Sequence, residues 1–263
     1  MHNSRPLNSL IIVPTYNERQ NIKTLCESIL RFTSETEILI VDDASPDGTG
    51  SLAEEMKAED RRVHVLHRPE KGGLGSACVS GFSWGLGRGF DPLIQTDADF
   101  SHNPRYLPTM LGLLRHYDGV IGSRYVASGG TLNWDAGRRA LSWCANLYAR
   151  LVLGTRIRDL TGGFNGWRSR ALLTIGLRSL RSKGYAFEIE LKHSVQAKGL
   201  KMIEFPITFQ ERRLGESKLG SGIALEAAIR VWLLRFQRRT KQEGEWVGDG
   251  IRTHGHRGHN PVL

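Results

Sequence analysis

Short apolar runs alternate with helical patterns along the first half of the chain. The apolar residues Leu10 to Val13 stop at Pro14, which is typical of a short buried parallel strand. Apolar positions at a spacing of three and four between Asn21 and Leu30 then predict a helix. Similar apolar runs begin at 37, 63, 93 and 119. We therefore expect an α/β fold, with a Rossmann-like, mostly parallel sheet that carries helices on both faces.

Polar residues follow these strands where each strand ends. They are Pro14 to Glu18, Asp42 and Asp43, Asp97 and Asp99, and Arg124. Because the carboxyl ends of parallel strands meet at one edge of a sheet, these groups predict a binding crevice there. The glycine-rich turn at Lys71 matches neither G-x-G-x-x-G nor a Walker sequence, which argues against a dehydrogenase.

Asp97-Ala98-Asp99 is the stretch with the clearest candidate chemistry. If the fourth strand runs up to the aspartates, its period of two points both carboxylates the same way, with Ala98 facing back. Divalent cations such as Mg²⁺ bind one or two carboxylates together with phosphate oxygens and water. A solvated turn also explains these residue types, but the polar groups at the other strand ends favour the metal site.

The pattern changes after Tyr125. We expect a flexible loop at 128–131, an amphipathic helix from Trp134 to Leu153, a loop with paired glycines at 161–164, a helix at 184–197, an edge strand at 201–209 and a basic loop at 211–218. The tail at 237–263 is polar and lacks periodicity, so we expect it to be disordered.

Residues Ile223 to Phe236 carry an apolar stripe at helical spacing. It consists of Leu225, Ile229, Trp232, Leu233 and Phe236. The helix either packs its stripe on the domain or lies in a membrane interface with nearby arginines on anionic lipid. No apolar run approaches the roughly 20 residues that span a bilayer, and the first residues do not resemble a secretory signal.

Charge and cysteine usage narrow the class of partner. The chain has 36 lysines and arginines against 27 aspartates and glutamates, a formal charge of +9. This excess suits nucleotide phosphates, an anionic membrane or nucleic acid, although no nucleic-acid motif is present. The three cysteines lie far apart, so they indicate neither a zinc site nor a disulfide framework and fit a reducing compartment.

Seven short motifs occur in one order along residues 8 to 236. They are P-T-Y-N-E-R at 14–19, V-D-D-x-S-P-D-G-T at 41–49, K-G-x-L-G at 71–75, D-A-D at 97–99, G-S-R-Y at 122–125, T-G-G-F at 161–164 and G-E-S-K at 215–218. Together they resemble the polyprenyl (dolichyl) phosphate mannose synthases of glycosyltransferase family 2, which have the GT-A fold. The resemblance implies a metal-dependent enzyme with one GT-A domain over 8–222, comprising a donor half at 8–125 and an acceptor half at 126–222.

The resemblance also implies roles for individual residues. Pro14, Tyr16, Glu18, Asp43, Ala98, Arg212 and Lys218 would bind the donor GDP-mannose, and Asp97 and Asp99 would hold Mg²⁺ or Mn²⁺. Ser101 stands where some relatives have a glutamine ligand to the metal. Arg124, Arg138 and Ser142 would grip the acceptor phosphate. Arg139 is expected to add to this grip, since Trp143 replaces a basic residue of many relatives.

The expected reaction is an inverting transfer of mannose to polyprenyl phosphate. The acceptor phosphate, with a second pKa of about 6, is largely ionised at neutral pH, so no general base is needed. A UDP-sugar donor for a glucose or N-acetylhexosamine transfer remains the alternative, and a non-catalytic nucleotide- or lipid-binding protein is a further one. The lipid acceptor places the enzyme peripherally on the cytoplasmic side of a membrane, alone or with a separate anchoring protein.

Overall fold

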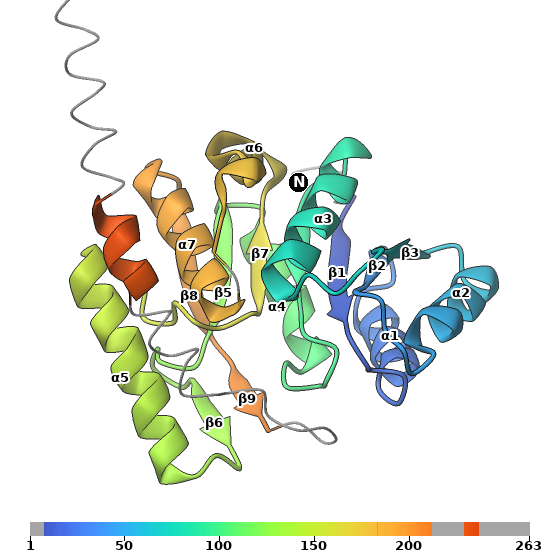
Figure 1. The fold of residues 1–263 in the computed structure, drawn as a ribbon, viewed down its shortest axis with the longest axis horizontal. Helices are drawn as coiled ribbons and strands as arrows, with labels where there is room; N and C mark the ends of the chain where they lie inside the picture. The colour runs from blue at the N-terminus through green and yellow to red at the C-terminus, as the bar shows by residue number, and fades with distance from the viewer. Residues whose placement is uncertain (1–7, 183, 212–228, 237–263) are drawn as a thin grey trace, which may run out of the picture.

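The computed structural model describes residues 8–182, 184–211 and 229–236. A seven-stranded sheet runs through it in the order β3-β2-β1-β4-β7-β5-β8 (Figure 1). The strands are β1 (Leu10–Thr15), β2 (Glu37–Asp42), β3 (Val63–His67), β4 (Leu93–Gln95), β5 (Gly119–Ser123), β7 (Asn165–Trp167) and β8 (Met202–Pro206). Strand β7 is antiparallel to both neighbours, and the other neighbouring pairs are parallel. The carboxyl ends of β1, β2, β4 and β5 therefore share one edge, as predicted.

Helices cover both faces of this sheet. They are α1 (Ile22–Phe32), α2 (Thr49–Glu59), α3 (Leu74–Gly87), α4 (Leu107–Leu113), α5 (Ala136–Leu153), α6 (Ser169–Ile175) and α7 (Gly184–Ala197), with short 3₁₀ turns at Pro104–Tyr106 and Leu177–Ser179. Alternate residues of β1 belong to two separate cores: Ile11 packs with residues of α1, α2 and α4, whereas Ile12 packs with residues of α3, α6 and α7. This burial on both faces explains why β1 reads as a continuous apolar run.

Pro14 does not end β1, contrary to the sequence-based expectation. The strand continues to Thr15, and Pro14 lies opposite Val41 of β2. The Ile12 carbonyl accepts the Thr96 N–H at 3.1 Å. Since the backbone groups of alternate residues point to the same side of a strand, Ile12 and Pro14 both direct theirs towards β4. Because β4 ends at Gln95, opposite Ile12, no ladder partner is lost at Pro14.

Two short strands in the second half were not predicted as strands. The segment 128–131, expected to be a flexible loop, contributes β6 (Gly130–Leu132), which pairs with β9 (Thr208–Gln210) in a second, two-stranded sheet. Strand β7 has only three residues and no apolar alternation, yet it lies between β4 and β5. The predicted edge strand at 201–209 is confirmed in part: β8 ends the order of the large sheet, but the range divides after Pro206 and its last residues belong to β9 of the second sheet.

Residues 229–236 form a short helix, drawn in red beside α5 in Figure 1. Its buried residues Val231 and Leu234 join a cluster that includes Ala149 and Leu153 of α5. The described members of the predicted stripe, Ile229, Trp232, Leu233 and Phe236, are instead exposed by 45–56%. The apolar stripe therefore faces outwards. No helix among residues 8–182, 184–211 and 229–236 has the length and apolar character needed to cross a membrane.

Candidate active site

The loop after β1 is tied to the loop after β2. The backbone N–H of Asn17 donates to Ser45 Oγ (3.1 Å), and that of Glu18 donates to Thr49 Oγ1 (3.0 Å). These bonds present the predicted donor residues Pro14, Tyr16 and Glu18 at one edge of the sheet. A positive charge stands beside them, since Lys71 Nζ lies 3.7 Å from the centre of the Tyr16 ring.

Asp43 anchors the glycine-rich turn that carries Lys71. Its buried carboxylate forms an ion pair with Arg68 and accepts the backbone N–H groups of Gly72 (3.0 Å) and Gly73 (2.7 Å). Charge-assisted bonds of this kind hold a turn firmly. Asp43 thus positions Lys71 next to Tyr16, and sequence analysis did not single out Arg68 or Lys71 as site residues.

Asp97 and Asp99 lie in a loop beyond the strand. Since β4 ends at Gln95 and Phe100 has φ +61°, the expected strand alternation of the two aspartates is wrong. The Asp97 side chain is 29% exposed, whereas Asp99 is buried and accepts the Ser101 N–H at 3.0 Å. The paired glycines at 161–164 bring the backbone close to this loop, because a Cβ on Gly163 would lie 3.3 Å from Asp97 Oδ1.

The donor atoms of this loop fit a hard divalent cation. Beside the two carboxylates, the buried Ser101 Oγ has no hydrogen-bond partner among the described residues. The described residues contain no group of three or more His, Cys, Asp or Glu side chains that could hold a metal. A metal at Asp97 and Asp99 would therefore need oxygens from a substrate, as is usual for Mg²⁺ on a nucleotide.

His102 supports the Asp97 loop and was missed by sequence analysis. Its Nδ1 accepts the Asp97 N–H at 3.5 Å, and its ring stacks on Phe164 with centroids 5.2 Å apart. Burial lowers the pKa of His102 to about 4, so the ring is neutral at pH 7 and can accept this bond.

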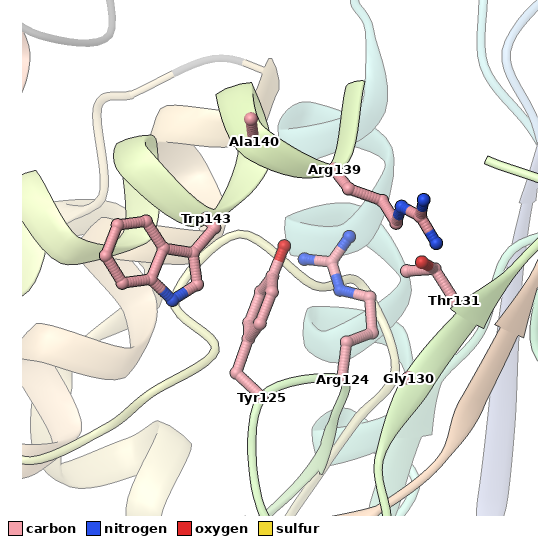
Figure 2. Close-up of a pocket in the computed structure, with 7 residues that line it drawn as sticks. All are labelled: Arg124, Tyr125, Gly130, Thr131, Arg139, Ala140 and Trp143. Atoms are coloured by element: carbon pink, nitrogen blue, oxygen red, sulfur yellow. The ribbon is translucent and has the colours of Figure 1, made fainter. Parts of the chain in front are cut away.

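A pocket of about 310 Å³ lies where the loop after β5 meets α5 (Figure 2). Its lining residues are Arg124, Tyr125, Gly130, Thr131, Arg139, Ala140 and Trp143. Figure 2 shows Arg139 reaching from α5 towards Thr131, with Arg124 on the same side of the Trp143 ring. The pocket is thus lined by two guanidinium groups together with aromatic and aliphatic side chains. This combination suits a phosphate that carries an apolar substituent.

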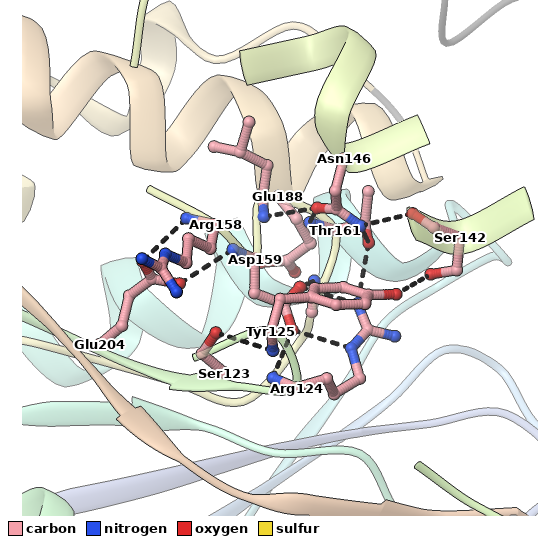
Figure 3. A network of polar contacts seen from close by, with 12 residues as sticks. Ser123, Arg124, Tyr125, Ser142, Asn146, Arg158, Asp159, Thr161, Glu188 and Glu204 are labelled. Atoms are coloured by element: carbon pink, nitrogen blue, oxygen red, sulfur yellow. Dashed lines mark hydrogen bonds and ion pairs between the residues drawn. The ribbon is translucent and has the colours of Figure 1, made fainter. Parts of the chain in front are cut away.

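Arg124 is held in this pocket by a buried ion pair (Figure 3). Asp159 Oδ2 accepts from Arg124 Nε at 2.8 Å, and Oδ1 accepts from the terminal nitrogen at 2.7 Å. Burial by itself would raise the pKa of Asp159, but the charge and hydrogen bonds of Arg124 lower it to about 2. The backbone N–H of Asp159 in turn donates to Glu204 of β8 at 2.9 Å. Asp159, which sequence analysis missed, therefore fixes the plane of the Arg124 guanidinium.

The other predicted acceptor residues lie at different places around the pocket. Ser142 Oγ accepts from the Tyr125 hydroxyl at 2.6 Å, so it orients a lining residue. Arg138 pairs with Glu211 at 2.7 Å and lies over the Trp134 ring instead of lining the pocket. Arg212 and Lys218 lie outside the described residues.

Residues 10–176 match the protein family that is described as glycosyl transferase family 2. The chain is 46% identical over 222 residues to an undecaprenyl-phosphate mannosyltransferase of Micrococcus luteus, covering 84% of this chain and 91% of the relative. It is 44% identical over 231 residues to a polyprenol monophosphomannose synthase of Mycolicibacterium smegmatis, covering 86% and 87%.

The fold is also similar to that of solved structures. The mannosyltransferase PcManGT from Pyrobaculum calidifontis, in complex with GDP-Man and Mn²⁺, aligns with a TM-score of 0.58 and 17% identity. The alignment covers 91% of this chain and 65% of that one. At this identity the likeness concerns the fold.

Proposed function

Because this chain belongs to glycosyl transferase family 2, and is therefore a glycosyltransferase, we propose that it transfers mannose from GDP-mannose to polyprenyl phosphate. The observation that carries the proposal is the pocket of Figure 2, in which Arg124 and Arg139 meet the apolar surface of Ala140 and Trp143. This chemistry suits a phosphate that carries an isoprenoid chain. The choice of mannose rests on the names of the two relatives.

On the donor side, Asp97 and Asp99 would hold Mg²⁺ or Mn²⁺, with Ser101 as a further oxygen donor. The metal would neutralise charge on the nucleotide diphosphate as it leaves. The proposed donor-binding residues are Pro14, Tyr16, Glu18, Asp43, Ala98, Arg212 and Lys218. Lys71 joins them, since it stands over Tyr16 at the same edge of the sheet.

The proposed reaction is an in-line displacement with inversion. An oxygen of the acceptor phosphate forms a bond to the anomeric carbon of mannose, and the bond from that carbon to the β-phosphate oxygen of GDP breaks. With a second pKa of about 6, the phosphate needs no base to remove a proton. Arg124 and Arg139 orient the phosphate, and the ion pair with Asp159 keeps the guanidinium group of Arg124 in place.

We propose that an apolar face of the helix at 229–236 binds the membrane that supplies the lipid. This apolar face consists of the exposed residues Ile229, Trp232, Leu233 and Phe236. The helix packs on Ala149 and Leu153 of α5. The same helix α5 carries Trp143, a half-exposed residue that lines the pocket.

A donor panel tests the proposed function. Purified protein with polyprenyl phosphate and Mn²⁺ should convert GDP-mannose to polyprenyl phosphate mannose and leave UDP-glucose and UDP-N-acetylglucosamine unchanged. The configuration at the anomeric carbon, determined by NMR, should be inverted. Turnover of UDP-glucose without GDP-mannose would show that the donor is wrong, and a retained configuration would show that the mechanism is wrong.

Replacing Trp232 and Phe236 together with serine should weaken binding to phosphatidylglycerol-containing vesicles by at least about tenfold, because each aromatic side chain contributes roughly 1.5–3 kcal/mol on burial. Co-sedimentation measures the binding. Leu173→Ser is the matched control, since Leu173 is 66% exposed on α6, outside the apolar face. Equal binding by the double variant and the control would contradict the proposed membrane contact.

A further inference from the structure

Two charged residues of α7 are buried beneath the candidate active site. Glu188 is 1% exposed and Lys192 is fully buried. They are four residues apart and share one face of the helix. Burying a charge is unfavourable unless other groups compensate it, and the proposed reaction uses neither side chain. Their partners therefore indicate what they do.

Glu188 joins the two strands that lead into the site loops. Its Oε1 accepts from Gln95 Nε2 at 2.5 Å, and its Oε2 accepts from Asn165 Nδ2 at 2.8 Å. Gln95 and Asn165 face each other across the antiparallel pair β4 and β7. Strand β4 ends at Gln95, just before Asp97, and β7 begins at Asn165, just after Gly163. The carboxylate thus holds both loops where they leave the sheet.

Lys192 forms hydrogen bonds with the backbone of the loop at 159–163. Its Nζ donates to the carbonyl oxygens of Gly162 (2.6 Å) and Leu160 (3.2 Å). One end of this loop carries Asp159, which fixes Arg124 of the acceptor pocket. The other end carries Gly163, whose backbone lies against the Asp97 carboxylate. A single loop therefore contacts both the donor side and the acceptor side.

We propose that Glu188 and Lys192 are positioning residues, which set the separation between Asp97 on the donor side and Arg124 on the acceptor side. Neither would touch the reacting atoms. A displacement of about 1 Å between two reacting groups can lower the rate about a hundredfold. The inference rests on the proposed function for its reaction, but the contacts of Glu188 and Lys192 with the two loops are independent of that function.

The decisive variant is the double substitution Glu188→Gln with Lys192→Met. It removes both buried charges while keeping side-chain size, so stability should stay close to that of the wild type. The bonds from Lys192 to the loop are lost. We expect kcat to fall about a hundredfold with little change in KM for GDP-mannose. We also expect the affinity for Mn²⁺ in the presence of GDP, measured by EPR, to fall about tenfold.

Val195→Ala is the matched control, because Val195 is fully buried on the same helix and its loss lowers stability without touching the loop. It should keep kcat and the Mn²⁺ affinity. If the double variant keeps both values, or if Val195→Ala loses them equally, the positioning role is wrong.

If the double variant does not fold, Lys192→Met alone decides. Methionine has no N–H to donate, so the carbonyl oxygens of Gly162 and Leu160 both lose the bond from residue 192, and an unchanged kcat and Mn²⁺ affinity would overturn the proposal. Failure of the wild type to use GDP-mannose would instead refute the proposed function, while the Mn²⁺ measurement with GDP would still test the positioning of the loop.

Discussion

Asp97→Asn should lower the rate of sugar transfer by at least about a hundredfold, because it removes a negatively charged ligand from the site that would stabilise the leaving diphosphate. The fold should remain intact. The Asp97 side chain is 29% exposed and lies in a loop, so its replacement should not disturb the packing of the hydrophobic core. We expect the free energy of unfolding to change by less than about 1 kcal/mol. Steady-state kinetics with Mn²⁺ and urea unfolding provide the two measurements.

Asp60→Asn is a matched control for this experiment. The Asp60 side chain is 30% exposed and pairs with Arg62, which follows α2 away from the candidate site. This variant should transfer sugar at the normal rate. A normal rate for Asp97→Asn as well would show that the metal assignment is wrong.

Asp159→Asn should lower the free energy of unfolding by about 3–5 kcal/mol, because it leaves the buried Arg124 guanidinium without its counter-charge. Urea unfolding at neutral pH measures the loss. Glu59→Gln is the control, since the Glu59 pair with Lys23 has side chains exposed by 49–65% and should contribute at most about 1 kcal/mol. Equal losses in the two variants would contradict the special role of the buried pair.

The contribution of Asp159 should also depend on pH. The pKa of its carboxyl group is lowered from an ordinary value of 3.8 to about 2 in the folded protein. The folded state therefore favours the ionised form, and this stabilisation is complete above the ordinary pKa and is lost as the pH falls from about 4 to about 2. The difference in unfolding free energy between the wild type and Asp159→Asn should shrink over that interval. A difference that stays constant down to pH 3 would contradict this assignment.

The candidate site was predicted best where local sequence determines the backbone. The strand ends that carry Pro14, Asp43, Asp97 and Arg124 were placed at one edge from the alternation of strands and helices alone, and the topology confirms this arrangement. The paired glycines at 161–164 likewise indicated a loop that allows close backbone approach, although only the structure shows that Asp97 lies against Gly163. The strand ends and the glycine pair are local features of the sequence, so a pattern can reveal them.

The outward orientation of the stripe at 229–236 illustrates what a pattern leaves open. An apolar stripe suits a protein core and a membrane interface equally well. The structure shows which side of the helix packs on the domain: Val231 and Leu234 pack on α5, while Trp232 and Phe236 are exposed. The helix can bury only one side against α5, and Val231 and Leu234 lie on that side.

The sequence by itself determined the α/β class, the edge of the sheet that carries the polar residues and the family motifs. The tertiary structure alone decided which polar and charged side chains are paired. Arg124 and Asp159 are 35 residues apart, and Gln95 and Glu188 are 93 apart. Such pairs form because β7 is inserted between β4 and β5 and α7 packs beneath their loops. Sheet order and helix packing depend on contacts along the whole chain, which is why no local pattern predicts them.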